Sequence, residues 1–183
     1  MNTKQIHSGD AGQTEILSGI SVPKNDPRIE TLGELDEVHS ILGIIRSLIK
    51  NKDIRELLVQ IQDDLRLSMG EIASDKADVS HANSLDDSHL VKIDEKIQEY
   101  QEQIELPKGF ITPGDDFTSA MIDLGRTITR RAERRVVGAF QAKIVRNQTI
   151  LRYVNRLSTL LYFMEIHEMK QSKSHRPIHN HIV

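Results

Sequence analysis

Apolar residues recur at helical spacing through five long segments, a pattern that limits the fold more than any other feature of this chain. Asp26 and Pro27 give the first segment an N-cap and a proline at the first helical position. Few runs alternate as a strand would, so the prediction is an all-α fold, a five-helix bundle with a ferritin-like up-down arrangement. The helices are expected at about 27–50, from a cap at Asp53 to 73, 90–106, from a cap at Asp115 or Asp116 to about 139, and 147–170.

One domain is expected, because 183 residues can bury a single core and no change of composition marks a second unit. Residues 1–27 are rich in Gly, Ser, Asp and Pro and predict a loop-like N-terminal arm. The helical bundle is expected to occupy 28–170, and 171–183 are expected to be a disordered tail.

Composition narrows the classes of function. The formal net charge is −3 and the pI is about 6.2, which argues against general nucleic-acid binding. With no cysteine there is no disulfide framework and no thiolate nucleophile or metal site. The sequence shows no signal peptide and no apolar run of about 20 residues, so a cytoplasmic protein that does not enter membranes is expected.

Five arginines and one carboxylate crowd residues 125–135, within the fourth predicted helix. Arg126, Arg130 and Glu133 share one stripe of that helix. The guanidinium groups of Arg126 and Arg130 suit phosphate or carboxylate oxygens. From the pattern alone, a solvated helix face held by ion pairs is an equally open interpretation of these charges. The core side is expected to be roughly opposite, at Phe117, Met121, Leu124, Ile128, Ala132 and Ala139.

Three helices also have a second face that mixes apolar and polar residues, which indicates an oligomer with sites near its interfaces. These faces carry Asp36 on the first helix, the Arg126 stripe on the fourth and Asn155 on the fifth. A carboxylate buried there would need a cation, so an ion pair between Asp36 and Arg126 is predicted.

Other motifs are weaker individually. The Gly9–Thr14 turn could wrap phosphates, and Lys24 and Arg28 add positive charge where a helix start would favour acids. Phe110 stands in a Pro-Gly loop, where its usual role would be to anchor the loop on the core. No repeated Glu-x-x-His or Ser-His-Asp constellation is present, so a catalytic metal held by side chains is not predicted, although scattered histidines could bind metal adventitiously.

In order along the chain, six segments resemble the PduO-type ATP:cob(I)alamin adenosyltransferases, from residue 7 to about 166. The segments are Gly9-Asp-x-Gly-x-Thr14, Lys24-Asn-Asp-Pro-Arg28, Gly33-Glu-Leu-Asp-Glu37, Phe110-Ile-x-Pro-Gly114, Arg126-Thr-x-x-Arg-Arg-Ala-Glu-Arg134 and Asn155-Arg-Leu-Ser158.

The resemblance implies a homotrimer with active sites between subunits, and transfer of the 5′-deoxyadenosyl group of ATP to the cobalt of cob(I)alamin, with release of triphosphate. It places Mg²⁺ on the ATP phosphates and allows a cobalamin reductase or a cobalamin-dependent enzyme as a partner. The catalytic residues implied are Asp36, Phe110, Arg126 and Arg130. The nucleotide-binding residues implied are Gly9, Asp10, Gly12, Thr14, Lys24, Arg28, Arg130, Glu133 and Asn155.

This chain departs from the family pattern at Ala11, Asp115, Gly125 and Thr159. Two other readings stay open: a non-catalytic relative that binds ATP or a corrinoid, and a helical module that docks an acidic protein or RNA. The first predicts nucleotide binding without turnover, and the second predicts salt-sensitive binding of polyanions without a preference for ATP.

Overall fold

The computed structural model describes residues 9–74, 84–107 and 109–172. Within them the five predicted helices are present, together with a two-stranded sheet in the arm. The elements are β1 (Gln13–Glu15), β2 (Ser21–Pro23), α2 (Pro27–Leu48), α3 (Lys52–Ser74), α4 (Asp87–Gln103), α5 (Phe117–Gln141) and α6 (Gln148–Ser172).

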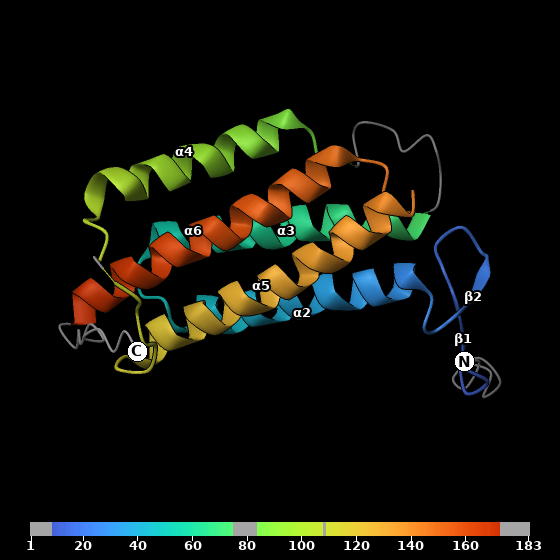
Figure 1. Cartoon of the computed structure of the whole chain (residues 1–183), viewed down its shortest axis with the longest axis horizontal. Coiled ribbons are helices and arrows are strands. Elements are labelled where there is room, and N and C mark those ends of the chain that lie inside the picture. The colour runs from blue at the N-terminus through green and yellow to red at the C-terminus, as the bar shows by residue number, and fades with distance from the viewer. Residues whose placement is uncertain (1–8, 75–83, 108, 173–183) are drawn as a thin grey trace.

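The helices lie roughly parallel to one long axis (Figure 1). Helix α5 packs between α2 and α6, while α3 lies against α2 and α4 against α6. Leu, Ile and Val side chains from all five helices form one continuous core. The arm lies at one end of the bundle, where α2 begins, and the loop before α5 lies at the opposite end (Figure 1).

Short polar side chains start the helices, as capping requires. The predicted cap at Asp26 is confirmed, since its carboxylate accepts the Arg28 N–H at 2.8 Å. Asp116, one of the two caps considered, accepts the Ser119 N–H at 2.8 Å. The predicted cap at Asp53 is wrong. Asn51 holds that position, and its side-chain oxygen accepts the backbone N–H of Asp53 at 2.8 Å.

Helix α4 (Asp87–Gln103) begins three residues before the predicted start at 90, in a polar stretch of the sequence. Asp86 caps it by accepting the Ser88 N–H at 2.9 Å, and the His89 ring lies 2.8 Å from the same carboxylate oxygen. These local bonds explain why a polar sequence forms a helix here.

The arm is not the featureless loop that its composition predicts. Gln13–Glu15 pairs antiparallel with Ser21–Pro23, and Gly19 turns the chain between them at φ +80°. Each strand has three residues, too few for alternation to be visible in the sequence. The Leu17 N–H donates to the Ala73 carbonyl at 3.0 Å, which ties the hairpin tip to the end of α3.

The core face of α5 is rotated from the predicted one. Phe117 and Leu124, expected inside, are 68% and 45% exposed, whereas Gly125 and Thr129 are buried. A Cβ on Gly125 would lie 2.8 Å from the Ile45 Cδ1, so the missing side chain lets α2 and α5 approach closely. Ala132 and Ala139 are buried as predicted, whereas Gly125 and Thr129 fall outside a pattern built on apolar side chains.

Helix α6 runs to Ser172, so its last residues occupy the start of the predicted tail. Ile166 of this helix is buried in the core. The rest of the predicted tail, 173–183, lies outside the described residues. No helix in the described part of the chain combines the length and apolar composition needed to cross a bilayer.

Candidate active site

The arginines of α5 divide into two groups by their partners. Arg131 donates to carboxylates of Glu34 and Glu37 on α2, with its Nε 2.6 Å from the Glu34 Oε2. Arg135 lies 3.6 Å from a carboxylate oxygen of Glu30. For these two arginines the ion-paired helix face is the right interpretation, and they join α5 to α2.

The second group, without a carboxylate partner among the described residues, contains Arg134, which donates to a backbone carbonyl, and Arg130. The Arg130 side chain is exposed, and no ion pair or side-chain hydrogen bond joins it to any described residue. Nearby, the Asn155 side-chain amide of α6 donates to the Glu133 carboxylate at 2.7 Å. The structure therefore brings together Glu133 and Asn155, two residues predicted to bind nucleotide, next to a guanidinium that is available to an anion.

Arg126 has carboxylate partners within its own chain. Its Nη2 lies 2.6 Å from the Asp123 Oδ1, and its Nε lies 3.8 Å from the Glu165 Oε2 of α6. Asp36 is exposed and forms no ion pair with Arg126. The predicted Asp36–Arg126 pair is thus absent from the single chain, because Asp123, one turn earlier on the same helix, reaches the guanidinium first.

Glu165 is an almost fully buried carboxyl group, 2% exposed. Burial raises the pKa of Glu165 to about 7, and the neighbouring Asp123 carboxylate raises it further than Arg126 lowers it. Two carboxylates therefore share one guanidinium, and one of them takes up a proton near neutral pH. The spacing of three residues between Asp123 and Arg126 could have predicted their contact, whereas no signal in the sequence pointed to Glu165.

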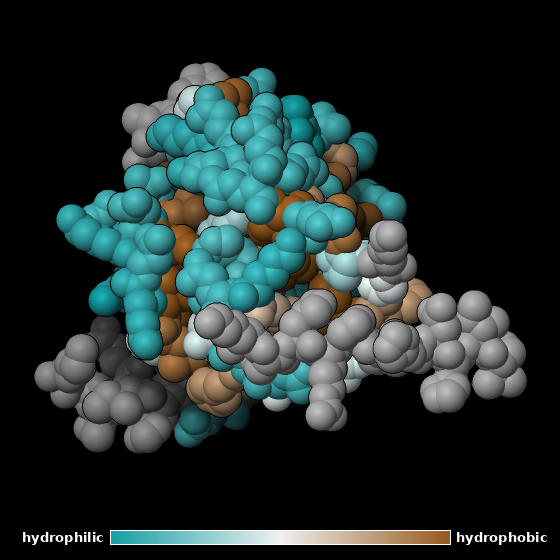
Figure 2. Space-filling view, turned by 90° about the vertical axis from the view of Figure 1, so that its left-hand side faces the viewer, coloured by the Kyte–Doolittle hydropathy of each residue, from teal (hydrophilic) through white to brown (hydrophobic). Residues whose placement is uncertain are grey.

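A pocket of about 580 Å³ opens beside this cluster. Asp123, Arg126 and Glu165 form its charged side, and Tyr162 and Ile111 line it as well. Phe110 is also part of the lining and is 90% exposed, so the phenylalanine does not anchor its loop on the core. Figure 2 shows this end of the bundle, where hydrophobic residues reach the surface between hydrophilic ones.

The N-terminal arm forms a separate group of predicted site residues. The Gly12 N–H donates to the Gly9 carbonyl at 3.1 Å, and Gly12 has a φ of +76°. The Lys24 N–H donates to the Gly12 carbonyl at 2.8 Å, and a Cβ on Gly9 would lie 2.9 Å from the Lys24 ammonium. The hairpin thus places Lys24 over the Gly9–Gly12 turn, while Arg28 lies in the first turn of α2.

Within one chain these groups stay apart. The arm lies beyond the start of α2, the Phe110 loop lies at the other end, and α5 runs between them (Figure 1). No hydrogen bond or ion pair between described residues joins Lys24 to Arg130, Glu133 or Asn155. One chain alone therefore does not assemble every predicted site residue in one place.

Residues 4–168 match the model of the cobalamin adenosyltransferase family. The corrinoid adenosyltransferase PduO of Salmonella typhimurium is 34% identical over 156 residues, which cover 85% of this chain and 46% of that protein. The chain thus spans about half the length of the PduO relatives from Salmonella typhimurium and Citrobacter freundii. A corrinoid adenosyltransferase of Bacillus subtilis is 31% identical, and the match covers 85% of this chain and 80% of that protein.

Solved structures agree with these matches. A variant of the PduO-type ATP:corrinoid adenosyltransferase from Lactobacillus reuteri, complexed with cobalamin and ATP, superposes with a TM-score of 0.86. The two sequences are 30% identical, and the superposition covers 96% of this chain and 95% of that one.

Proposed function

Because the chain belongs to the cobalamin adenosyltransferase family, we propose that it transfers the 5′-deoxyadenosyl group of ATP to the cobalt of cob(I)alamin. The electron pair of cobalt(I) forms the bond to the C5′ of ATP. The bond between C5′ and the triphosphate oxygen breaks, and its electron pair leaves with triphosphate. No proton is transferred in this step, so the protein needs no general base.

The unpaired state of Arg130 is the observation that carries this proposal. On the same helix Arg131 and Arg135 have carboxylate partners, whereas Arg130 is exposed and has none among the described residues. A guanidinium left free beside the Asn155–Glu133 pair can stabilise the negative charge that develops on a leaving triphosphate. Arg134 also has no carboxylate partner among the described residues, but it donates to the Arg130 backbone carbonyl and lies off the stripe that carries Glu133.

The other groups have roles that follow from their chemistry. Gly9, Asp10, Gly12 and Thr14 would hold the nucleotide through the turn, and Lys24 and Arg28 would add positive charge at the phosphates. This set offers the phosphates mainly cations and N–H groups, so Mg²⁺ would be held by the ATP phosphates.

Phe110 would occupy the lower face of the corrinoid cobalt. There the aromatic ring would exclude an axial ligand and leave cobalt(II) four-coordinate, which makes its reduction to cobalt(I) easier. The 90% exposure of Phe110 at a pocket mouth supports this role, since a side chain packed on the core could not meet a ligand.

We also infer that the complete site forms between subunits of a homotrimer. No hydrogen bond or ion pair between described residues joins Lys24 of the arm to Arg130, Glu133 or Asn155, so a neighbouring copy would have to complete the site. In that assembly the exposed Asp36 would face the neighbouring subunit and could pair with Arg126 there, in competition with Asp123.

The direct test mixes the purified protein with ATP, Mg²⁺ and chemically reduced cob(I)alamin under anaerobic conditions. Formation of the light-labile cobalt–carbon product is followed by absorbance. The product should form with the wild type and with Arg66→Ala, an exposed arginine of α3 outside the site, and should be lost in Arg130→Ala. ATP binding without product by the wild-type protein would refute the proposal and identify a non-catalytic relative.

A further inference from the structure

A second cluster of positive charge surrounds the turn that joins α2 to α3. A groove of about 540 Å³ is lined there by Arg46, Lys50, Lys52 and Arg55, with Glu56 as its one acidic lining residue. Arg46 comes from the last turn of α2, Lys50 from the connection after it, and the other three from the start of α3. None of these residues belongs to the site described above.

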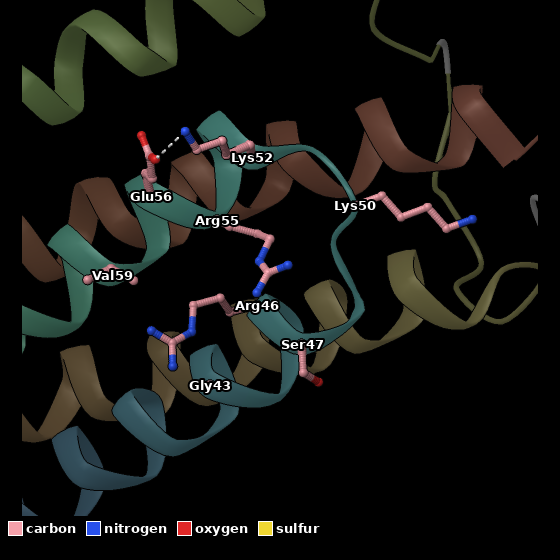
Figure 3. Close-up of a pocket in the computed structure, with 8 residues that line it drawn as sticks. All are labelled: Gly43, Arg46, Ser47, Lys50, Lys52, Arg55, Glu56 and Val59. Atoms are coloured by element: carbon pink, nitrogen blue, oxygen red, sulfur yellow. Dashed lines mark ion pairs between the residues drawn. The ribbon is translucent and has the colours of Figure 1, made fainter.

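The positive charge in this groove is not neutralised by the described part of the chain. Lys52 lies 3.5 Å from Glu56, whereas no ion pair or hydrogen bond to a described residue is formed by the side chains of Arg46, Lys50 and Arg55. In Figure 3 the guanidinium groups of Arg46 and Arg55 both extend into the space between the two helices, while Lys50 points away from it. Two like charges that face one groove repel each other unless an anion lies between them.

The position of the charges in the helices gives a second, independent reason to expect an anion in this groove. Arg46 near the end of α2 suits the negative end of that helix dipole, but Lys52 and Arg55 lie in the first turn of α3, where the dipole favours anions. The floor of the groove is low because Gly43 and Ser47, one turn apart on α2, have small side chains. The two guanidinium groups therefore face the same open space, while Asn51 caps the N–H groups of Asp53 and Ile54 at the start of α3.

We propose that this groove is a binding site for a polyphosphate chain, with Arg46 and Arg55 as its main ligands. Guanidinium forks bind phosphate oxygens through paired, charge-assisted hydrogen bonds, and two forks suit a chain that has more than one phosphate group. The volume is that of a small-molecule site. The same chemistry is present in free triphosphate and in the phosphates of a nucleoside triphosphate, so the test must separate these two sources.

The test measures binding of sodium triphosphate by isothermal titration calorimetry in about 0.15 M salt, which screens weak surface attraction. Every protein carries Arg130→Ala, so that triphosphate binding at the proposed active site is weakened. Arg46→Gln with Arg55→Gln removes the two groove guanidinium groups. Arg66→Gln with Arg152→Gln is the matched control, because it changes the charge equally at exposed, ion-paired positions elsewhere.

The proposal predicts that the groove variant binds triphosphate at least about tenfold more weakly than the control, which keeps the parent affinity. Equal affinity for triphosphate in the groove and control variants would overturn the proposal. Absence of triphosphate binding by the protein that carries Arg130→Ala alone would also overturn it. A parallel titration with ATP identifies the source from the difference between the groove and control variants, because both keep the residues of the proposed active site other than Arg130. A larger loss of affinity for ATP than for triphosphate in the groove variant indicates a nucleotide site, and an equal loss indicates a site for the phosphate chain alone. Circular dichroism confirms that each variant keeps its helical content. Because every protein in these titrations lacks Arg130, a negative result for the groove does not bear on the proposed transferase activity.

Discussion

Glu165→Gln should make the protein more stable at alkaline pH, although it removes a charged partner of Arg126. The wild-type carboxyl group is buried, and its pKa is raised from 4.5 to about 7 in the folded state. At 1.36 kcal/mol for each pH unit, this difference corresponds to about 3 kcal/mol of destabilisation when the folded protein must ionise the group. Glutamine has nearly the same shape and cannot ionise, so the variant avoids this cost.

The direction in which the free energy of unfolding changes with pH follows from proton binding. Below pH 4.5 the group is protonated in both the folded and the unfolded chain, and it contributes no pH dependence. Between pH 4.5 and about 7 the folded chain retains a proton that the unfolded chain has released, so the free energy of unfolding falls as pH rises. Above about pH 7 both forms are ionised, and the full cost is present.

The assay is urea unfolding of wild type and Glu165→Gln at fixed protein concentration, between pH 5 and pH 8. The stability of the variant relative to wild type should grow by about 2.5 kcal/mol over this range. Glu105→Gln, at an exposed position in the loop after α4, is the control and should show no such growth. If the two curves for wild type and Glu165→Gln stay parallel from pH 5 to pH 8, the burial argument for Glu165 is refuted.

Three further outcomes are expected. Phe110→Ala should lower the rate of adenosylation and remove the spectrum of four-coordinate cobalt(II), and full activity with that spectrum retained would exclude the proposed role. Tyr153→Phe should cost about 2 kcal/mol of unfolding free energy, because the Tyr153 hydroxyl donates to the half-buried Asp64 carboxylate at 2.7 Å. Burial raises the pKa of Asp64, so urea unfolding should show a larger loss at pH 8 than at pH 4, and an equal loss would contradict this account. Asn51→Ala should cost about 1 kcal/mol as a lost helix cap, while Asp53→Asn should cost only a few tenths, and thermal unfolding would reveal the reverse order if Asp53 were the cap.

The sequence was a sound guide to the helices because each buries a stripe of large apolar residues at regular spacing. It was a poorer guide where small residues decide the packing. Gly125 turns toward Ile45 in the core, which leaves Phe117 and Leu124 at the surface, whereas a pattern of apolar side chains assigns no core position to a glycine. The arm hairpin was missed for a related reason, since strands of three residues give no periodicity.

The site shows the same division between local and distant information. Glu133 and Asn155 were predicted as nucleotide ligands, and the structure places them in contact, although they come from different helices. The partners of Arg126 could not all be predicted: Asp123 is near in sequence, but Glu165 reaches the guanidinium only through the packing of α6 on α5. The catalytic and nucleotide-binding roles remain predictions until the variants are measured.

The bond from the hairpin tip to the end of α3 has a thermodynamic consequence for ligand binding. An arm that folded only around its ligand would bury apolar surface in that event, and calorimetry would record a large negative change in heat capacity. Here contacts within the chain itself bury Ile16 and join the Leu17 N–H to the Ala73 carbonyl. The entropy of ordering residues 9–26 is therefore lost when the chain folds, and the enthalpy of nucleotide binding should change little with temperature.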